Sequence, residues 1–264
     1  MGNERQGITE SGLRKDLNEM TELIEKYRNA TNKLILLDYD GTLVDFSPLP
    51  EKAIPSEKLL DILIKLIEKP QTKVIIISGR GHQDIDKLLG HLPIDIIAEH
   101  GAMIKENGKW KKQSIDNGLW KNAVLPLLNR TTLTCPKSFV EEKLFSLTWH
   151  YRNAESGYVH SRELICILED LIHSYNLKIL DGNKGLEVMS EKIGKGIAVE
   201  KLLEQNNYDY ILSIGDDKTD EEMFESLLHN ANAVTVKVGK GSTSAKYKLD
   251  KVNDVISFLG RLSQ

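Results

Sequence analysis

Residues 33–42 read KLILLDYDGT, and this stretch decides the fold expected of the 264-residue chain. Its apolar part is continuous rather than alternating, which is typical of a strand buried on both faces of a parallel sheet. Asp38 and Asp40 follow where the apolar run ends, and Gly41 allows the chain to turn away. Ligands of open α/β sheets bind beyond the carboxyl ends of the strands. The stretch therefore predicts a central strand that delivers two carboxylates to a binding edge.

Similar buried runs recur on both sides of this strand. Further strands are predicted over 73–77, 95–98, 210–214 and 233–238, and helices over 55–68, 80–89, 194–204, 219–228 and 254–262. Thr219 and Glu222 have the spacing of a capping box for the fourth of these helices. Strands that alternate with helices indicate an α/β fold with a Rossmann-like, doubly wound parallel sheet.

The alternation is interrupted once, over residues 102–189. A hairpin centred on 106–108, helices over 119–128 and 160–175, and strands over 144–151, 177–180 and 185–189 are predicted there. We therefore expect a core over 33–101 and 190–264 with an inserted α+β cap domain over 102–189. Apolar residues from Leu13 to Tyr27 recur on one helical face, which predicts an N-terminal helical segment within 1–32.

Composition excludes several classes of protein. The net charge is −4 and charged residues make up 28% of the chain, so nothing attracts it generally to nucleic acid or to an anionic membrane. Two cysteines, Cys135 and Cys166, do not make a disulfide scaffold. The sequence has no apolar run of about eighteen residues and no signal-peptide pattern. We expect a cytoplasmic protein without a membrane segment.

Polar clusters follow the predicted core strands. Ser78 and Arg80 come after the strand at 73–77, an acidic group over 216–220 follows the strand at 210–214, and Lys195 opens a helix. Because the carboxyl ends of parallel strands meet at one edge of a sheet, we expect these side chains to lie near Asp38.

Carboxylates that are buried close together call for a cation. Asp38, Asp40 and Asp216 would provide a site of hard oxygen ligands, which suits Mg²⁺. Each cluster alone has a simpler interpretation: an Asp-Gly turn at Asp40 and Gly41, or a helix cap at Asp216. Their joint occurrence on one edge favours the magnesium site.

The same side chains fit a phosphatase. The Asp38 carboxylate can attack phosphorus and form an aspartyl phosphate, which divides one difficult hydrolysis into two easier steps. Asp40 would protonate the leaving oxygen and then take a proton from water. Thr42 and Ser78 can bond phosphoryl oxygens, and Lys195 adds a positive charge.

In order, residues 38–42, Ser78, Lys195 and 215–220 resemble the four motifs of the haloacid-dehalogenase superfamily of phosphatases. The resemblance implies a Rossmann-like core with a mobile lid. It implies Mg²⁺ held by Asp38, the Asp40 carbonyl and Asp216. It also implies that Asp220 lies behind the metal ligands and that Asp217 contacts metal-bound waters.

A narrower resemblance covers nearly the whole chain from Asn32. It is carried by LDYDGTL (37–43), SGR (78–80), AEHG (98–101), WHYR (149–152) and GDDKTDE (215–221), which together look like the trehalose-6-phosphate phosphatase family. In that family a Glu-x-Lys pair, an arginine and a later glutamate of the cap hold the disaccharide. The residues expected to bind substrate here are therefore Glu141, Lys143, Arg152 and Glu187, together with Arg80.

The resemblance implies a phosphoric monoester hydrolase that acts on trehalose 6-phosphate, and association with a synthase domain or subunit. Two alternatives stay open at this stage. One is a phosphatase for another sugar phosphate, such as sucrose 6-phosphate. The other is a non-catalytic domain that senses phosphosugars within a synthase assembly. The oligomeric state, a monomer or an unknown oligomer, is also open.

Overall fold

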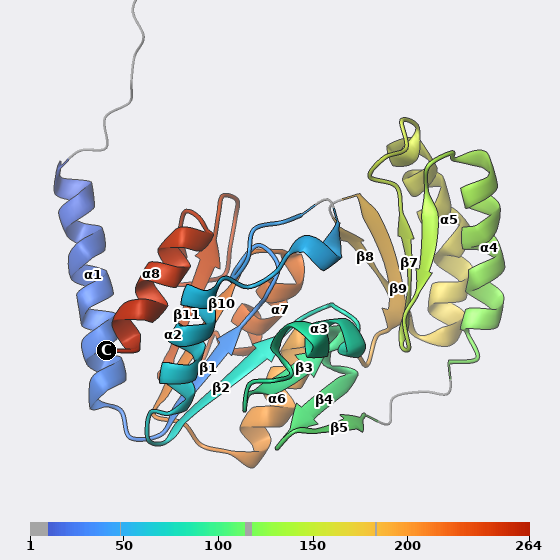
Figure 1. The fold of residues 1–264 in the computed structure, drawn as a ribbon. Coiled ribbons are helices and arrows are strands. Elements are labelled where there is room, and N and C mark those ends of the chain that lie inside the picture. Colours follow the sequence, from blue (N-terminus) through green and yellow to red (C-terminus); the bar gives the residue numbers. More distant parts are fainter. Residues whose placement is uncertain (1–9, 48, 114–117, 183) are drawn as a thin grey trace, which may run out of the picture.

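A computed structural model describes residues 10–47, 49–113, 118–182 and 184–264. Its larger sheet has eight strands in the order β12-β11-β10-β1-β2-β3-β4-β5 (Figure 1). The strands are β1 (Lys33–Leu37), β2 (Thr72–Ile77), β3 (Asp95–Ala98), β4 (Met103–Glu106), β5 (Lys109–Lys112), β10 (Tyr210–Gly215), β11 (Ala233–Val238) and β12 (Tyr247–Leu249). All neighbours pair in parallel except β3 with β4 and β4 with β5.

Helices cover both faces of this sheet, as the α/β prediction requires. One face carries α1 (Glu10–Asn29), α2 (Glu57–Ile67), α3 (His82–Leu89) and α8 (Val252–Leu262), and the other carries α6 (Lys195–Gln205) and α7 (Lys218–Ser226). Short 3-10 helices lie at η1 (Pro50–Lys52) and η2 (Glu99–Gly101). The doubly wound fold class is confirmed. None of the described helices is long and apolar enough to cross a membrane.

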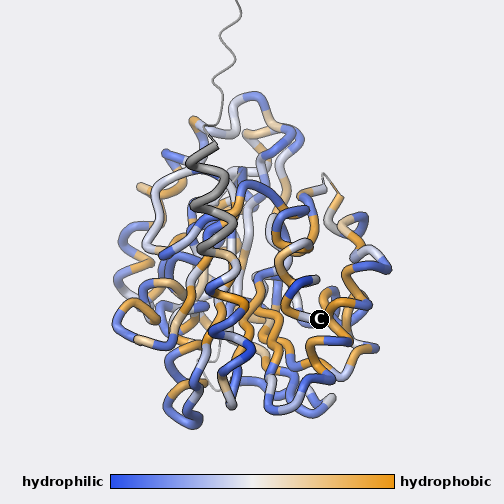
Figure 2. Tube along the Cα trace, turned by 90° about the vertical axis from the view of Figure 1, so that its left-hand side faces the viewer, coloured by the Kyte–Doolittle hydropathy of each residue, from blue (hydrophilic) through white to orange (hydrophobic). Residues whose placement is uncertain are grey.

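The central strand β1 shows why its sequence is apolar at every position. Ile35 and Leu37 pack with α2 and α8, whereas Leu34 and Leu36 pack with α6 and α7. All four side chains are fully buried. In Figure 2 hydrophobic stretches of the coloured trace gather in the interior, and hydrophilic stretches lie mostly outside. A strand covered on both faces cannot alternate, so the continuous run follows from the fold.

A second sheet forms the unit that we call the cap. It has four antiparallel strands in the order β6-β7-β9-β8: β6 (Phe139–Glu142), β7 (Ser146–His150), β8 (Leu177–Gly182) and β9 (Gly185–Ser190). Helices α4 (Lys121–Thr134) and α5 (Gly157–Tyr175) cover its outer side, so its inner face is turned toward the core (Figure 1). Leu147 and Trp149 of β7 are buried against these helices. The alternate residues of β7 therefore face the core.

The hairpin of β4 and β5 joins the large sheet, because β4 pairs with β3 in antiparallel register. The sequence pattern predicts these residues within the insert over 102–189. A hairpin pattern identifies two paired strands but not the sheet that they extend. We propose that the insert begins after β5, and the division into core and cap stays a prediction.

Other expectations need correction. The capping box of α7 is formed by Asp217 and Asp220, not by Thr219 and Glu222, because the helix begins at Lys218. The short strands β6 and β12 were not predicted. In α1, Leu23, Ile24 and Tyr27 are buried as the helical face predicts. The predictions for residues 1–9 and for the side chains of Leu13 and Leu17 concern positions outside the described part of the chain.

Candidate active site

The carboxyl edge of the large sheet brings Asp38, Lys195 and Asp220 into direct contact. Asp38 follows β1, Lys195 opens α6, and Asp220 lies in the first turn of α7. The Lys195 ammonium donates to Asp38 Oδ1 and to Asp220 Oδ1, each at 2.7 Å. All three side chains are buried. A buried lysine between two carboxylates compensates part of the cost of removing them from water.

An acidic cluster with the chemistry of a cation site lies beside this lysine. Asp38, Asp216 and Asp220 each offer a carboxylate oxygen, and these atoms lie within 4.8 Å of one another. Asp38 Oδ2 is buried and has no hydrogen-bond partner among the described residues. A carboxylate oxygen buried in this way is costly unless a cation or a ligand compensates it. The donor set is all oxygen, so these residues fit Mg²⁺.

The pKa values reflect this crowding. Burial, reinforced by the charge of Asp220, raises the pKa of Asp38 well above its usual range. The same two causes raise the pKa of Asp216 to about 7. Burial opposes ionisation of Asp217 as well, but Lys195 and the Thr219 hydrogen bond lower its pKa to about 2. The cluster thus resists carrying all its negative charges at once without a compensating cation.

Asp40 does not belong to this cluster. Its two carboxylate oxygens accept hydrogen bonds from Arg80 Nε and Nη2, both at 2.6 Å. The Arg80 guanidinium also lies 5.1 Å from the centroid of the Tyr39 ring. Arg80 is predicted among the substrate-binding residues, and in the structure its guanidinium binds Asp40.

Gly41 and Thr42 shape the turn after β1. Gly41 has φ +82°, and a Cβ atom there would overlap the Asp216 carboxylate. Glycine therefore allows the turn after β1 to lie close to the loop after β10, which carries Asp216. The Thr42 hydroxyl is buried and has no hydrogen-bond partner among the described residues. The Ser78 hydroxyl lies at the end of β2 and accepts a bond of 3.2 Å from Arg80 N.

Predicted cap residues line the inner face of the small sheet. Glu141 of β6 and Glu187 of β9 both pair with Thr148 of β7, so the three residues form a row across the sheet. Lys143 Nζ lies 2.9 Å from Glu187 Oε1 and donates to the Gly79 carbonyl of the core at 3.1 Å. The row thus lies above the carboxyl edge of the large sheet.

The two cap glutamates have different partners. Glu141 Oε2 lies 2.7 Å from His150 Nε2, and Glu187 Oε2 lies 3.3 Å from His100 Nε2. Burial alone would raise the pKa of Glu187, but Lys143 and His100 hold it well below its usual range. Arg152 is exposed in the turn that follows β7.

A cleft of about 410 Å³ separates the start of α3 from the loop between β6 and β7. Its lining includes the predicted residues Glu141 and Lys143, and also His82, Glu99 and Lys121. Glu99 accepts a bond of 3.0 Å from Phe145 N of the cap. Glu99 lies in the motif at 98–101, but no role is predicted for it, because its contact with Phe145 depends on a turn with positive φ at Glu99 and His100.

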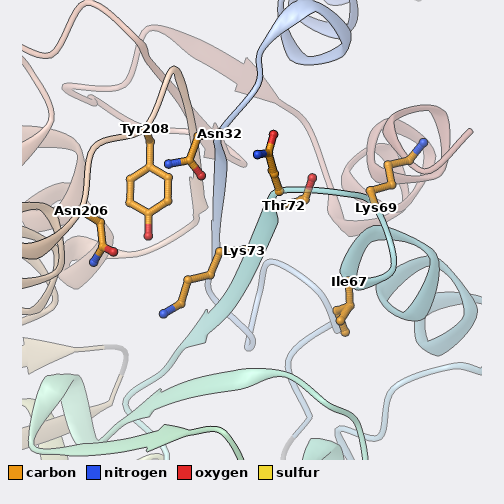
Figure 3. Close-up of a pocket in the computed structure, with 8 residues that line it drawn as sticks. Asn32, Ile67, Lys69, Thr72, Lys73, Asn206 and Tyr208 are labelled. Carbon is orange, nitrogen blue, oxygen red and sulfur yellow. The ribbon is translucent and has the colours of Figure 1, made fainter.

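Another hollow, of about 400 Å³, lies at the amino ends of β1, β2 and β10, opposite the acidic cluster (Figure 3). Asn32, Thr72, Lys73 and Tyr208 are among the residues that line it. Lys73 is paired with Asp95 at 3.0 Å. This hollow contains none of the predicted site residues and stands apart from the chemistry described above.

The chain is similar in sequence and in structure to proteins of a known family. The family model described as Trehalose-phosphatase matches residues 36–253. The chain belongs to this family. A structure of the C-terminal domain of trehalose-6-phosphate phosphatase from C. albicans has a TM-score of 0.86 at 30% identity, over 92% of this chain and 96% of that one. The resemblance deduced from the motifs is thereby confirmed.

The curated relatives that the chain matches include longer proteins. A bifunctional trehalose-6-phosphate synthase/phosphatase from Thermoproteus tenax is 38% identical over 91% of this chain and 33% of its own length. A trehalose-phosphatase from Saccharomyces cerevisiae is 35% identical over 78% of this chain and 26% of its own. The chain therefore spans about a third or less of these two relatives. A haloacid-dehalogenase-like hydrolase from B. subtilis, at 15% identity and a TM-score of 0.62, shares the fold.

Proposed function

We propose that this member of the trehalose-phosphatase family hydrolyses trehalose 6-phosphate to trehalose and phosphate through an aspartyl phosphate on Asp38, in a Mg²⁺-dependent reaction. One observation carries the proposal. Asp38 Oδ1 is held by Lys195, while Asp38 Oδ2 is buried without a hydrogen-bond partner among the described residues. One oxygen is fixed and the other is left for bonding, which is what an oriented carboxylate nucleophile requires.

In the first step, Asp38 Oδ2 attacks phosphorus and the bond between phosphorus and the sugar oxygen breaks. The sugar oxygen keeps the electron pair and takes a proton from Asp40. In the second step, water attacks phosphorus, Asp40 takes a proton from that water, and the bond to Asp38 breaks. Asp40 and Asp38 thus return to their starting states, with phosphate as the second product.

Thr42 and Ser78 would donate to the phosphoryl oxygens. The Thr42 hydroxyl can donate in this way, since it has no hydrogen-bond partner among the described residues. A Mg²⁺ ion held by Asp38, Asp216 and the Asp40 carbonyl, with Asp220 and Asp217 behind it, would supply the positive charge that offsets the repulsion between carboxylate and phosphate. Lys195 contributes a fixed charge of the same sign.

The trehalose moiety would be bound by the inner face of the cap. Glu141 and Glu187 can accept hydrogen bonds from vicinal hydroxyls, and Lys143 and Arg152 can donate to hydroxyl or phosphate oxygens. The cleft that Glu141 and Lys143 line supports this placement. We also propose Arg80 as a phosphate-binding residue once it leaves Asp40.

A substrate panel tests the assignment. Purified chain with Mg²⁺ is offered trehalose 6-phosphate, sucrose 6-phosphate and glucose 6-phosphate, and released phosphate is measured. We expect the highest kcat/KM with trehalose 6-phosphate. Preference for another sugar phosphate would overturn the assignment of trehalose 6-phosphate as substrate, while the assignment as a phosphatase would stand. Binding without turnover would favour a phosphosugar-sensing domain.

The relatives also bear on partners. The Thermoproteus tenax relative is named as a synthase and a phosphatase in one protein. We propose that this chain works beside a synthase domain or subunit in the cytoplasm. Co-purification of a synthase with the tagged chain from its native cells tests this, and a chain recovered alone under the same conditions contradicts it.

A further inference from the structure

Lys237 lies buried beneath the loop that carries Asp216. It is the charged residue of β11, a strand whose six residues are all buried. Its ammonium donates to the Asp216 carbonyl and lies 3.5 Å from the Asp217 carbonyl. No role is predicted for Lys237 from the sequence. The signal available was a lysine in a strand that is otherwise apolar except for Thr235, since such a group is rarely buried without a partner.

The loop is held from its other side by Asp220. Asp220 Oδ2 accepts hydrogen bonds from Asp216 N at 2.8 Å and from Asp217 N at 3.0 Å. The backbone amides of Asp216 and Asp217 therefore bond the Asp220 side chain, and their carbonyls face the Lys237 ammonium. Asp220 is itself fixed by Lys195. This double restraint acts on the backbone that orients the Asp216 carboxylate.

Lys237 has an anchor of its own. Glu221 Oε1 lies 3.4 Å from Lys237 Nζ, and Glu221 Oε2 accepts bonds from Thr243 Oγ1 at 3.1 Å and from Ser244 N at 2.8 Å. A buried ammonium needs such pairing to offset its desolvation. The chain of contacts thus runs from the loop at 243–244 through Glu221 and Lys237 to Asp216.

We propose that Lys237 is a positioning residue that fixes the backbone at Asp216 and Asp217 and thereby strengthens Mg²⁺ binding by the acidic cluster. The inference rests on the proposed function only in taking Asp216 as a ligand of Mg²⁺. Groups that orient metal ligands typically change metal affinity by about 10- to 100-fold when they are removed.

The sign of the effect separates positioning from charge. Lys237 is a cation near the site, so its loss removes a repulsion with Mg²⁺ and by electrostatics alone would tighten binding. If Lys237 acts mainly by orienting the loop, Lys237→Met weakens binding despite that gain. The two explanations predict opposite changes in the same quantity.

The test uses Mg²⁺ alone as the probe, with binding measured by calorimetry and by the rise in Tm across a titration. We expect Lys237→Met to weaken Mg²⁺ binding about 10-fold. Lys105→Met is the matched control, because Lys105 is also buried and paired, with Asp86 at 2.6 Å on the far side of the sheet. This control should lose stability and keep the wild-type Mg²⁺ affinity.

Unchanged or tighter Mg²⁺ binding by Lys237→Met overturns the proposal. If that variant does not fold, Glu221→Gln serves in its place, since it keeps the ammonium and weakens its anchor, and unaltered affinity there overturns the proposal equally. If the wild-type chain binds Mg²⁺ but releases no phosphate, the proposed function is wrong. The Mg²⁺ affinities of wild type and Lys237→Met can still be compared in that case. A wild-type chain that binds no Mg²⁺ overturns both.

Discussion

Asp40 and Arg80 are joined by two hydrogen bonds of 2.6 Å, from Nε to one carboxylate oxygen and from Nη2 to the other. The pair links the turn after β1 to the turn after β2. A bidentate fork fixes the orientation of a carboxylate as well as its distance. It also gives each oxygen one donor, so proton transfer by Asp40 uses a remaining lone pair of one oxygen or follows the loss of one of these bonds. Loss of the fork would release Arg80 to meet the substrate.

Arg80→Lys tests this relationship, because lysine keeps the charge and loses the fork. We expect kcat with trehalose 6-phosphate to fall about 10- to 100-fold through misplacement of Asp40. The loss with p-nitrophenyl phosphate should be smaller, since nitrophenolate leaves without a proton. Steady-state kinetics on both substrates decide the matter, and equal losses would contradict the role assigned to the pair.

Gly41→Ala should destabilise the chain and impair the site. The substitution adds a side chain at φ +82° and drives its Cβ into the Asp216 carboxylate. Gly108→Ala is the control, at φ +74° with open space around it. Gly108→Ala should cost about 1–2 kcal/mol from conformation alone. Gly41→Ala should lower the free energy of unfolding by about 1–3 kcal/mol more than Gly108→Ala does, because of the added overlap. Chemical denaturation compares them, and equal losses would refute close approach of the two loops.

Glu187 should make stability depend on acid pH. Its pKa is lowered in the folded chain, where Lys143 and His100 outweigh burial, and is ordinary in the unfolded chain. Stability from this group is therefore complete above about pH 4.5 and is lost as the pH falls toward the folded pKa. Glu187→Gln should lower Tm near neutral pH and flatten its decline below that value. A Tm profile parallel to that of wild type would contradict this.

Thr148→Val should leave stability unchanged or raise it. The Thr148 hydroxyl is buried and has no hydrogen-bond partner in the described part of the chain, and valine has nearly the same shape. Ser146→Ala is the comparison, because its hydroxyl donates to Glu187 at 2.6 Å. That change should cost about 1 kcal/mol. Urea denaturation of both variants compares their free energies of unfolding. A larger loss for Thr148→Val than for Ser146→Ala would show that the Thr148 hydroxyl is hydrogen-bonded in solution.

The sequence predicts those parts of the site that depend on topology. Asp38 and Lys195 meet because one follows a parallel strand and the other opens a helix at the same edge of the sheet. The partners of Asp40 and Lys237 could not be predicted, since they depend on how loops of different strands turn toward one another. The hairpin of β4 and β5 shows the same limit. The local pattern predicts that these two strands pair with each other, but it does not predict which sheet the hairpin joins.

The most direct test of the account asks whether phosphate is transferred to Asp38. The chain is mixed with Mg²⁺ and trehalose 6-phosphate and quenched within a turnover. Borohydride then reduces any acyl phosphate to an alcohol, which fragment masses locate in the digested peptides. We predict that the modified residue is Asp38 and that Asp38→Asn shows neither modification nor turnover while it keeps its fold. Rapid phosphate release without modification at Asp38, or by Asp38→Asn, would contradict the central claim.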